Sequence, residues 1–386
     1  MARVLLGWEL GAGTGHSSRL RRIGARLSAD GHQPIYVAQD IGAMPPGEVW
    51  QAPLWPAQLT ILARPSTTTP ATMGDILVAL GLREPSALAV LIGAWDRLLA
   101  AIRPDVVAAE FAPALMLAAA GRVPVLGLGT AFGLPPADMD AFPSLTGAPA
   151  LHDEAVLLAD VNAALRANGR TPIAALPRIF TATRELAAAF AEFDPYRAWR
   201  KAPHGAPALP GAIPLAGPDR DELFIYMNGS QTRPGAFWQG LALSGMKVRI
   251  HDPRLSEADR ALLRSAGFLV EDRPIPFADV ARRSRLLLSH GGLGFATSAL
   301  LAGLPQILIP FDIEKRLIAR AVTDLDLGVE MQIGTVTAGQ FAAALRHVAA
   351  DEALLARSRA AAPHFRARVT ANSEGQAADL LAKLAG

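Results

Sequence analysis

Residues 286–322 read LLLSHGGLGFATSALLAGLPQILIPFDIEKRLIARAV, with no charged side chain from Leu286 to Phe311. The stretch is long enough for a membrane-spanning helix, which needs about 20 mostly apolar residues. Several glycines interrupt it early, however, and Pro305 and Pro310 would each destabilise a helix interior by roughly 3 kcal/mol. The pattern instead predicts a strand over 285–289, a glycine loop, a helix to about 302, a strand over 305–309 and a charged helix from about 313.

The composition is that of a large chain with little net charge. At 386 residues, two domains are expected. Lys and Arg number 37 against 35 Asp and Glu, and a net charge of +2 excludes the strong basic field of a nucleic-acid-binding protein. The eight histidines show no metal-ligand spacing, so no metal is expected. The absence of cysteine excludes disulfides and Cys catalysis, and with a start that lacks a signal-peptide pattern it predicts a cytoplasmic protein.

Apolar strands and amphipathic helices alternate twice along the chain. The first series begins with RVLLGWEL at 3–10, a glycine loop and a helix over about 18–30, and the second begins with ELFIYMNGS at 222–230. Such alternation predicts parallel strands joined by crossover helices. The predicted parts are an N-terminal Rossmann-like domain (1–205), a Pro/Gly-rich linker (206–220), a C-terminal Rossmann-like domain (221–372) and a last helix (373–386), whose return to the first domain is left open.

A strand, a glycine loop and a helix follow one another at three places. The loops are Gly11–Gly15, Asn228–Ser230 and His290–Gly294. This arrangement presents backbone N–H groups and the positive end of a helix dipole to a phosphate. Two of the loops fall in the second half, after strands whose carboxyl ends are the usual place for ligands of open parallel sheets. A phosphate-containing ligand is therefore expected in the second domain.

Three segments resemble the family 1 glycosyltransferases of the GT-B fold. Residues 289–322 resemble the donor-binding motif of that family, and 13–32 (GTGHSSRLRRIGARLSADGH) and 103–120 (RPDVVAAEFAPALMLAAA) resemble its N-terminal landmarks. The resemblance implies an α/β protein with two Rossmann-like domains whose parallel sheets face each other across a cleft. It also implies an inverting transfer of a sugar from a UDP or dTDP sugar to the hydroxyl of a small molecule, with no cofactor or metal.

The resemblance assigns roles to individual residues. His16 would be the general base, since deprotonating a hydroxyl needs a group that titrates near neutrality, and Glu110 would orient it. The residues implied for donor binding are Gly13, Gly229, Ser230, Ile275, Pro276, His290, Gly291, Gly292, Gly294, Ser298, Glu314 and Lys315. On aromatic character and loop position, the candidate walls of the acceptor pocket are Trp50, Trp55 and Phe132.

Four positions differ from the family pattern. Ser298 stands where a ribose-binding Glu is common, and Phe295 replaces a Ser or Thr that reaches the phosphate. Lys315 replaces Gln, and Pro274 replaces an aromatic residue that stacks on the base in some members. These differences favour a deoxyribonucleotide donor or an acidic donor sugar.

Other functions fit parts of the same pattern. The GAGTGHSS loop with Asp40 is similar to the start of a dinucleotide-binding oxidoreductase, although His16 stands where the third glycine would fall. A nucleotide-sugar epimerase or hydrolase, or a degenerate member that only binds the nucleotide sugar, would share the donor site. The expected partners are the nucleotide sugar and a small-molecule acceptor, without nucleic acid, while membrane contact through 44–62 and the oligomeric state are left open.

Overall fold

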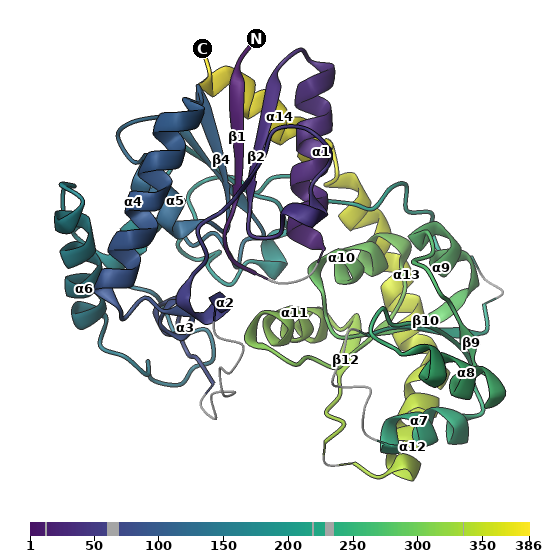
Figure 1. Cartoon of the computed structure of the whole chain (residues 1–386). Coiled ribbons are helices and arrows are strands. Elements are labelled where there is room, and N and C mark those ends of the chain that lie inside the picture. Colours follow the sequence, from purple (N-terminus) through teal and green to yellow (C-terminus); the bar gives the residue numbers. More distant parts are fainter. Residues whose placement is uncertain (12–13, 60–68, 218–219, 228–234, 335) are drawn as a thin grey trace. The chain divides into compact units, whose positions relative to one another are not determined.

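A computed structural model describes the chain except for residues 12–13, 60–68, 218–219, 228–234 and 335 (Figure 1). Three residues implied for donor binding, Gly13, Gly229 and Ser230, lie outside the described residues. The chain divides into two compact units. Unit 1 comprises Met1–Ala208 and Ala371–Gly386, and unit 2 comprises Leu209–Thr370.

Unit 1 is built on a six-stranded sheet in the order β3-β2-β1-β4-β5-β6, in which every pair of neighbours is parallel. Its strands are β1 (Arg3–Trp8), β2 (Gln33–Ala38), β3 (Val49–Gln51), β4 (Val106–Glu110), β5 (Val125–Gly129) and β6 (Arg184–Ala187). Its helices are α1 (Gly15–Ala29), η1 (Ile41–Ala43), α2 (Pro56–Leu59), α3 (Met73–Leu80), α4 (Pro85–Ile102), α5 (Pro113–Ala119), α6 (Glu154–Ala167), η2 (Leu176–Phe180), η3 (Ala191–Phe193) and α14 (Ser373–Leu384).

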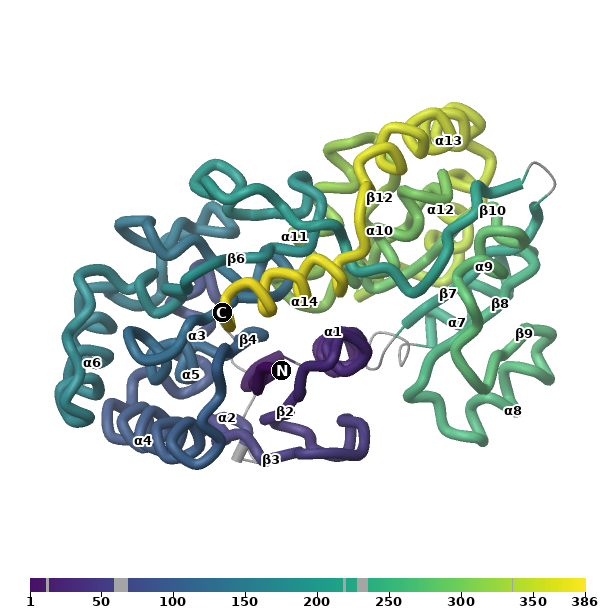
Figure 2. The backbone as a smooth tube through the Cα atoms, turned by 90° about the horizontal axis from the view of Figure 1, so that it is seen from above, coloured from purple at the N-terminus to yellow at the C-terminus, as the bar shows by residue number. Residues whose placement is uncertain are grey.

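Helices cover both faces of this sheet, which explains why its central strands read as continuous apolar runs. Helices α1 and α14 pack together on one face, and α4 and α5 pack together on the other (Figures 1 and 2). The last helix is buried through Ala377, Ala378 and Leu381, which join the core formed by β1, β4 and α1. The C-terminal segment thus contributes directly to the core of unit 1.

Helix α4 is the one described helix that is long and apolar enough to span a membrane. Its buried side chains recur at helical spacing and include Leu88, Ile92, Trp95 and Leu99. The helix packs against α5 and α6. This one-sided burial is typical of a core helix that covers a sheet.

Unit 2 repeats the architecture with a second parallel sheet in the order β12-β11-β10-β7-β8-β9. Its strands are β7 (Glu222–Tyr226), β8 (Lys247–His251), β9 (Leu269–Val270), β10 (Ser284–Ser289), β11 (Gln306–Leu308) and β12 (Gly328–Glu330). Its helices are α7 (Gly235–Ser244), α8 (Glu257–Ser265), α9 (Phe277–Arg283), α10 (Leu293–Ala302), α11 (Ile313–Asp324), α12 (Ala338–Ala350) and α13 (Glu352–Ala367).

In each sheet the order of the strands reverses once: the first strands along the chain are added toward one edge and the later ones toward the other. Ligands of such folds bind at the carboxyl ends of the two strands on either side of this switch point. In unit 1 these strands are β1 and β4, with Trp8 opposite Glu110. In unit 2 they are β7 and β10, with Tyr226 opposite Ser289. The topology therefore brings the sequence motifs of each unit to its expected ligand edge.

The Pro/Gly-rich segment expected to be a linker is hydrogen-bonded at both ends. At its start, the Ala206 amide donates to Gln376 Oε1 at 2.9 Å, within unit 1. Further on, within unit 2, the Ile213 carbonyl accepts from Arg366 at 2.6 Å and the Ala216 amide donates to the Ala302 carbonyl at 2.8 Å. Each end of the segment is therefore fastened to one of the two units.

Candidate functional site

In unit 1, His16 and Glu110 lie together at the switch point between β1 and β4. Helix α1 begins at Gly15, earlier than the sequence pattern predicts, so His16 lies in its first turn and not in the preceding loop. Glu110 is the last residue of β4 and is fully buried. His16 Nδ1 lies 2.8 Å from Glu110 Oε1, and the other ring nitrogen makes no hydrogen bond to a described residue. The expected histidine–carboxylate pair is therefore present in the structure.

A third side chain, Arg19, joins this pair and was missed in the sequence. Its guanidinium donates to the same oxygen, Glu110 Oε1, at 2.5 Å, and the residue is 5% exposed. Burial by itself raises the pKa of Glu110, but Arg19 and His16 outweigh it and hold that pKa below its ordinary value. Because residues three apart share one helix face, the spacing of Arg19 from His16 was the available signal.

Two aromatic rings lie near the imidazole of His16 in stacked orientations. The Trp8 ring lies 5.6 Å away at an interplanar angle of 19°, and the Phe111 ring lies 6.4 Å away at 28°. Gly11, which lies beyond the end of β1, has a φ of +90°, and a Cβ at this position would lie only 2.2 Å from His16 Nε2. Both the backbone conformation and the available space therefore require glycine at position 11.

Replacing Gly11 with alanine is expected to displace the His16 ring and to destabilise unit 1 by about 1–2 kcal/mol, since a Cβ at positive φ is strained. Gly15→Ala is the matched control, because a Cβ there has no neighbour within 4 Å among the described residues. Thermal unfolding would measure the stability, and the ring-current shifts of the His16 protons, imposed by Trp8, would report its position. Unchanged His16 shifts in Gly11→Ala would contradict the close contact.

The prediction of Trp55 as an acceptor wall is wrong. Trp55 is 1% exposed and donates from its indole to Glu9 Oε2 at 2.9 Å. Glu9 also accepts from the amides of Ala114 and Leu115, at 3.0 and 2.6 Å, in the first turn of α5. Burial raises the pKa of Glu9 to about 7 despite these hydrogen bonds. Trp55 thus belongs to the packing beneath its own loop.

The other two aromatic candidates remain at the surface of unit 1. Trp50, on the edge strand β3, is 38% exposed, and its indole is 3.3 Å from Glu48 Oε1. Phe132 is half-buried in the loop that follows β5. That loop passes beside the His16 site, because a Cβ at Gly133 would lie 3.4 Å from the Phe111 ring. Of the three aromatic residues, Phe132 has the strongest structural link to the site.

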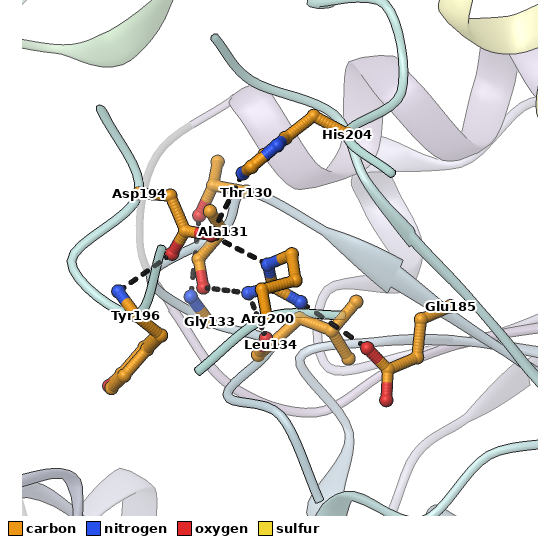
Figure 3. A network of polar contacts seen from close by, with 9 residues as sticks. All are labelled: Thr130, Ala131, Gly133, Leu134, Glu185, Asp194, Tyr196, Arg200 and His204. Carbon is orange, nitrogen blue, oxygen red and sulfur yellow. Dashed lines mark hydrogen bonds and ion pairs between the residues drawn. The ribbon is translucent and has the colours of Figure 1, made fainter. Parts of the chain in front are cut away.

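A buried polar network fixes this loop (Figure 3). Arg200 donates to the Leu134 carbonyl at 2.8 Å and to the Ala131 carbonyl at 3.4 Å. Asp194 Oδ2 accepts from Arg200 Nε at 2.6 Å and lies 2.9 Å from His204 Nε2. Burial opposes ionisation of Asp194, but His204 and Arg200 lower its pKa below the ordinary value. The stretch from Asp194 to His204 therefore supports the loop after β5.

In unit 2, His290 and its glycines connect β10 to α10. His290 is 6% exposed, and burial, followed by the charge of Lys315, lowers its pKa to about 4, so the ring is neutral at pH 7. Gly291 has a φ of +85°, and a Cβ there would lie 3.0 Å from the Lys315 carbonyl. A Cβ at Gly294 would have no neighbour within 4 Å. In the part of the chain that the structure describes, space is thus open beside the first turn of α10.

The start of α10 is suited to an anion. Gly292 is the N-cap, no side chain caps the helix, and its first turn has no acidic residue. The first N–H groups of a helix have no partner within the helix, and they carry the positive end of its dipole. A neutral histidine and free amides therefore lie at the same carboxyl edge of the sheet.

Ser298 cannot contact a ligand in this structure, contrary to its predicted role. It is fully buried and donates its hydroxyl to the Gly294 carbonyl at 2.7 Å. Phe295 lies one turn earlier and stacks on Tyr226, with ring centroids 4.1 Å apart and an interplanar angle of 7°. An aromatic stack therefore occupies the place where the related family has a phosphate-binding hydroxyl.

The remaining candidates for donor binding lie at the starts of two other helices. Lys315 Nζ is 2.6 Å from Glu314 Oε2, and its amide donates to Asp312 Oδ1 at 2.9 Å in the first turn of α11. Burial would lower the pKa of Lys315, but Glu314 and Asp312 outweigh it and raise that pKa. Ile275 is half-buried, and Pro276 is the N-cap of α9. Among the described residues, no group of three or more potential metal ligands occurs.

Known proteins resemble part of this sequence. Residues 265–374 match the family described as Erythromycin biosynthesis protein CIII-like, C-terminal domain. The NDP-glycosyltransferase YjiC of Bacillus subtilis (strain 168) is 35% identical over 83 residues, which are 22% of this chain and 21% of that protein. The matched segment therefore spans about a fifth of this curated relative.

Solved structures resemble the whole chain. The calicheamicin glycosyltransferase CalG4 superimposes with a TM-score of 0.69 at 20% identity, covering 99% of this chain and 98% of that one. The glycosyltransferase VinC, solved in complex with dTDP, gives a TM-score of 0.66 at 16% identity, with 99% of each chain covered. The chain therefore has the GT-B fold of these glycosyltransferases.

Proposed function

We propose that this protein is a glycosyltransferase that moves a sugar from a nucleotide diphosphate sugar to a hydroxyl group of a small molecule. The observation that carries the proposal is the 2.8 Å contact between His16 Nδ1 and the buried Glu110. A protein that only binds the nucleotide sugar would need the His290 loop but not this pair. A histidine oriented by a carboxylate is suited to remove a proton from an acceptor hydroxyl.

In the proposed reaction, His16 Nε2 takes the acceptor proton while the acceptor oxygen bonds to the anomeric carbon. The bond from that carbon to the diphosphate breaks on the opposite face, so the configuration inverts. Glu110 holds the imidazole in place through its contact with Nδ1. The negative charge that develops on the leaving diphosphate is stabilised by the amides at the start of α10, close to His290. The mechanism requires neither a cofactor nor a metal.

We propose dTDP as the nucleotide of the donor. The side chain at 298 is a buried serine that bonds to its own helix, so it offers nothing to a ribose hydroxyl. The structure of VinC, which shares the fold, holds dTDP. We also favour a neutral donor sugar over an acidic one, because the Lys315 ammonium already lies 2.6 Å from the Glu314 carboxylate.

Nucleotide binding tests the proposal before any acceptor is known. A ligand at 100 times its Kd should stabilise the native state by about 2.7 kcal/mol. We expect dTDP to raise the thermal midpoint of the wild type more than UDP or GDP does, and His290→Ala to abolish the effect. His347→Ala, at an exposed position on α12, is the matched control. Stabilisation by NADH or NADPH alone, or an undiminished dTDP effect in His290→Ala, would overturn the proposal.

A further inference from the structure

Two donors share a single oxygen of Glu110. His16 Nδ1 and Arg19 both contact Oε1, at 2.8 and 2.5 Å. The second oxygen, Oε2, is buried and has no hydrogen-bond partner among the described residues. One carboxylate oxygen of Glu110 therefore contacts both the permanently charged Arg19 and the ionisable ring of His16.

This sharing alters what the carboxylate does for His16. In a pair of histidine and carboxylate alone, the full negative charge stabilises the protonated ring. Here the guanidinium of Arg19, which is always charged, already balances Glu110. Because Arg19 is 5% exposed and Glu110 is fully buried, solvent screens their charges little. Protonation of His16 thus adds a positive charge to a pair that is already neutral.

Among the described residues, no second carboxylate near His16 replaces the negative charge of Glu110 that Arg19 neutralises. The rings of Trp8 and Phe111 flank His16. On α14, which packs against α1, Glu374 is paired with Arg22 at 2.6 Å. Glu9, just beyond β1, directs its carboxylate oxygens to the Trp55 indole and to the first turn of α5. Among the described residues, no other acidic side chain hydrogen-bonds to His16 or Arg19.

We propose that Arg19 weakens His16 as a general base. The enzyme would therefore react faster with acceptor hydroxyls that ionise readily, such as phenols, than with alkyl alcohols. The pKa of a phenol, like that of the tyrosine side chain, is about 10, whereas the pKa of an alkyl alcohol is, like that of water, far higher. The phenol proton passes to His16 Nε2, and the phenolic oxygen bonds to the anomeric carbon as the diphosphate leaves. The acceptor preference rests on the proposed function, and Arg19 itself acts only through Glu110.

The first test follows the titration of His16 by NMR in the free protein, with His16→Asn to assign its signal. In Arg19→Met, which removes the charge but keeps much of the side-chain length, we expect the titration midpoint to rise by about one pH unit or more. Arg19→Lys, which keeps the charge, should leave the midpoint close to that of the wild type. Arg19→Gln provides a second uncharged variant if Arg19→Met does not fold. An unchanged midpoint in the folded uncharged variants overturns the inference.

The second test compares two acceptors of similar shape, 4-nitrophenol and 4-nitrobenzyl alcohol, with a dTDP sugar. We expect the wild type to favour the phenol by about 100-fold or more in kcat/KM, and Arg19→Met to narrow this ratio at least tenfold. A wild type that does not favour the phenol overturns the preference, and an equal ratio in both proteins overturns the role of Arg19 in it. Because the titration needs no substrate, failure of the wild type to glycosylate any acceptor would overturn the proposed function separately from the effect of Arg19 on His16.

Discussion

His16→Ala is expected to lower kcat for sugar transfer by about 10²–10⁴-fold, the usual contribution of a general base. Every described residue that is proposed to bind the donor lies in unit 2, whereas His16 and Glu110 lie in unit 1. The variant should therefore bind dTDP with unchanged affinity. Product formation at saturating donor would measure the first effect, and dTDP-dependent thermal stabilisation the second.

The control for this experiment is His364→Ala, which removes an exposed histidine on α13. It should transfer sugar at the wild-type rate. Transfer by His16→Ala within a few-fold of the wild type would contradict the role of this residue as the base. Loss of dTDP binding in His16→Ala would instead show that the residue serves the donor.

Asp194→Ala is expected to destabilise unit 1 by about 3–5 kcal/mol, because it leaves a buried arginine without its main counter-ion. The side chain of Asp194 is fully buried, and that of Arg200 is 1% exposed. For a unit of this size the thermal midpoint should fall by about 10 °C. Since Arg200 also binds the carbonyls of Ala131 and Leu134, the loop that carries Phe132 should lose protection from hydrogen exchange.

Asp138→Ala is the matched control, because Asp138 pairs with Lys201 at the surface, where the two side chains are 38% and 83% exposed. Its loss should cost less than about 1 kcal/mol. The pKa of Asp194 is lowered by folding, so its contribution is complete at neutral pH and is lost as the pH falls below about 4. Equal midpoints for the two variants at pH 7 would contradict the importance of the buried pair.

Local patterns in the sequence predicted the elements and the fold correctly. The strand expected over 285–289 is β10, and the helix expected from about 313 is α11. The two Rossmann-like units followed from a repeated alternation of strands and helices, and the GT-B fold was implied by the resemblance of the motif around His290 to the glycosyltransferase family. These features can be predicted from the sequence because they depend on residues that are close together in the chain. Strand and helix periodicity are local in this sense, and so is the need for glycine at a turn such as Gly291.

The pairing of His16 with Glu110 was implied by the resemblance to the family 1 glycosyltransferases. By itself, the sequence thus determined the parallel α/β architecture and the places where strands end in glycine loops. Only the tertiary structure revealed that Arg19 reaches the same carboxylate, that Trp55 is buried against Glu9, and that Asp194 and Arg200 support the loop after β5. Such contacts join residues as far apart as Arg19 and Glu110, 91 positions in the chain, and depend on how every helix packs on its sheet. No local periodicity carries that information, because burial and charge pairing are properties of the assembled core.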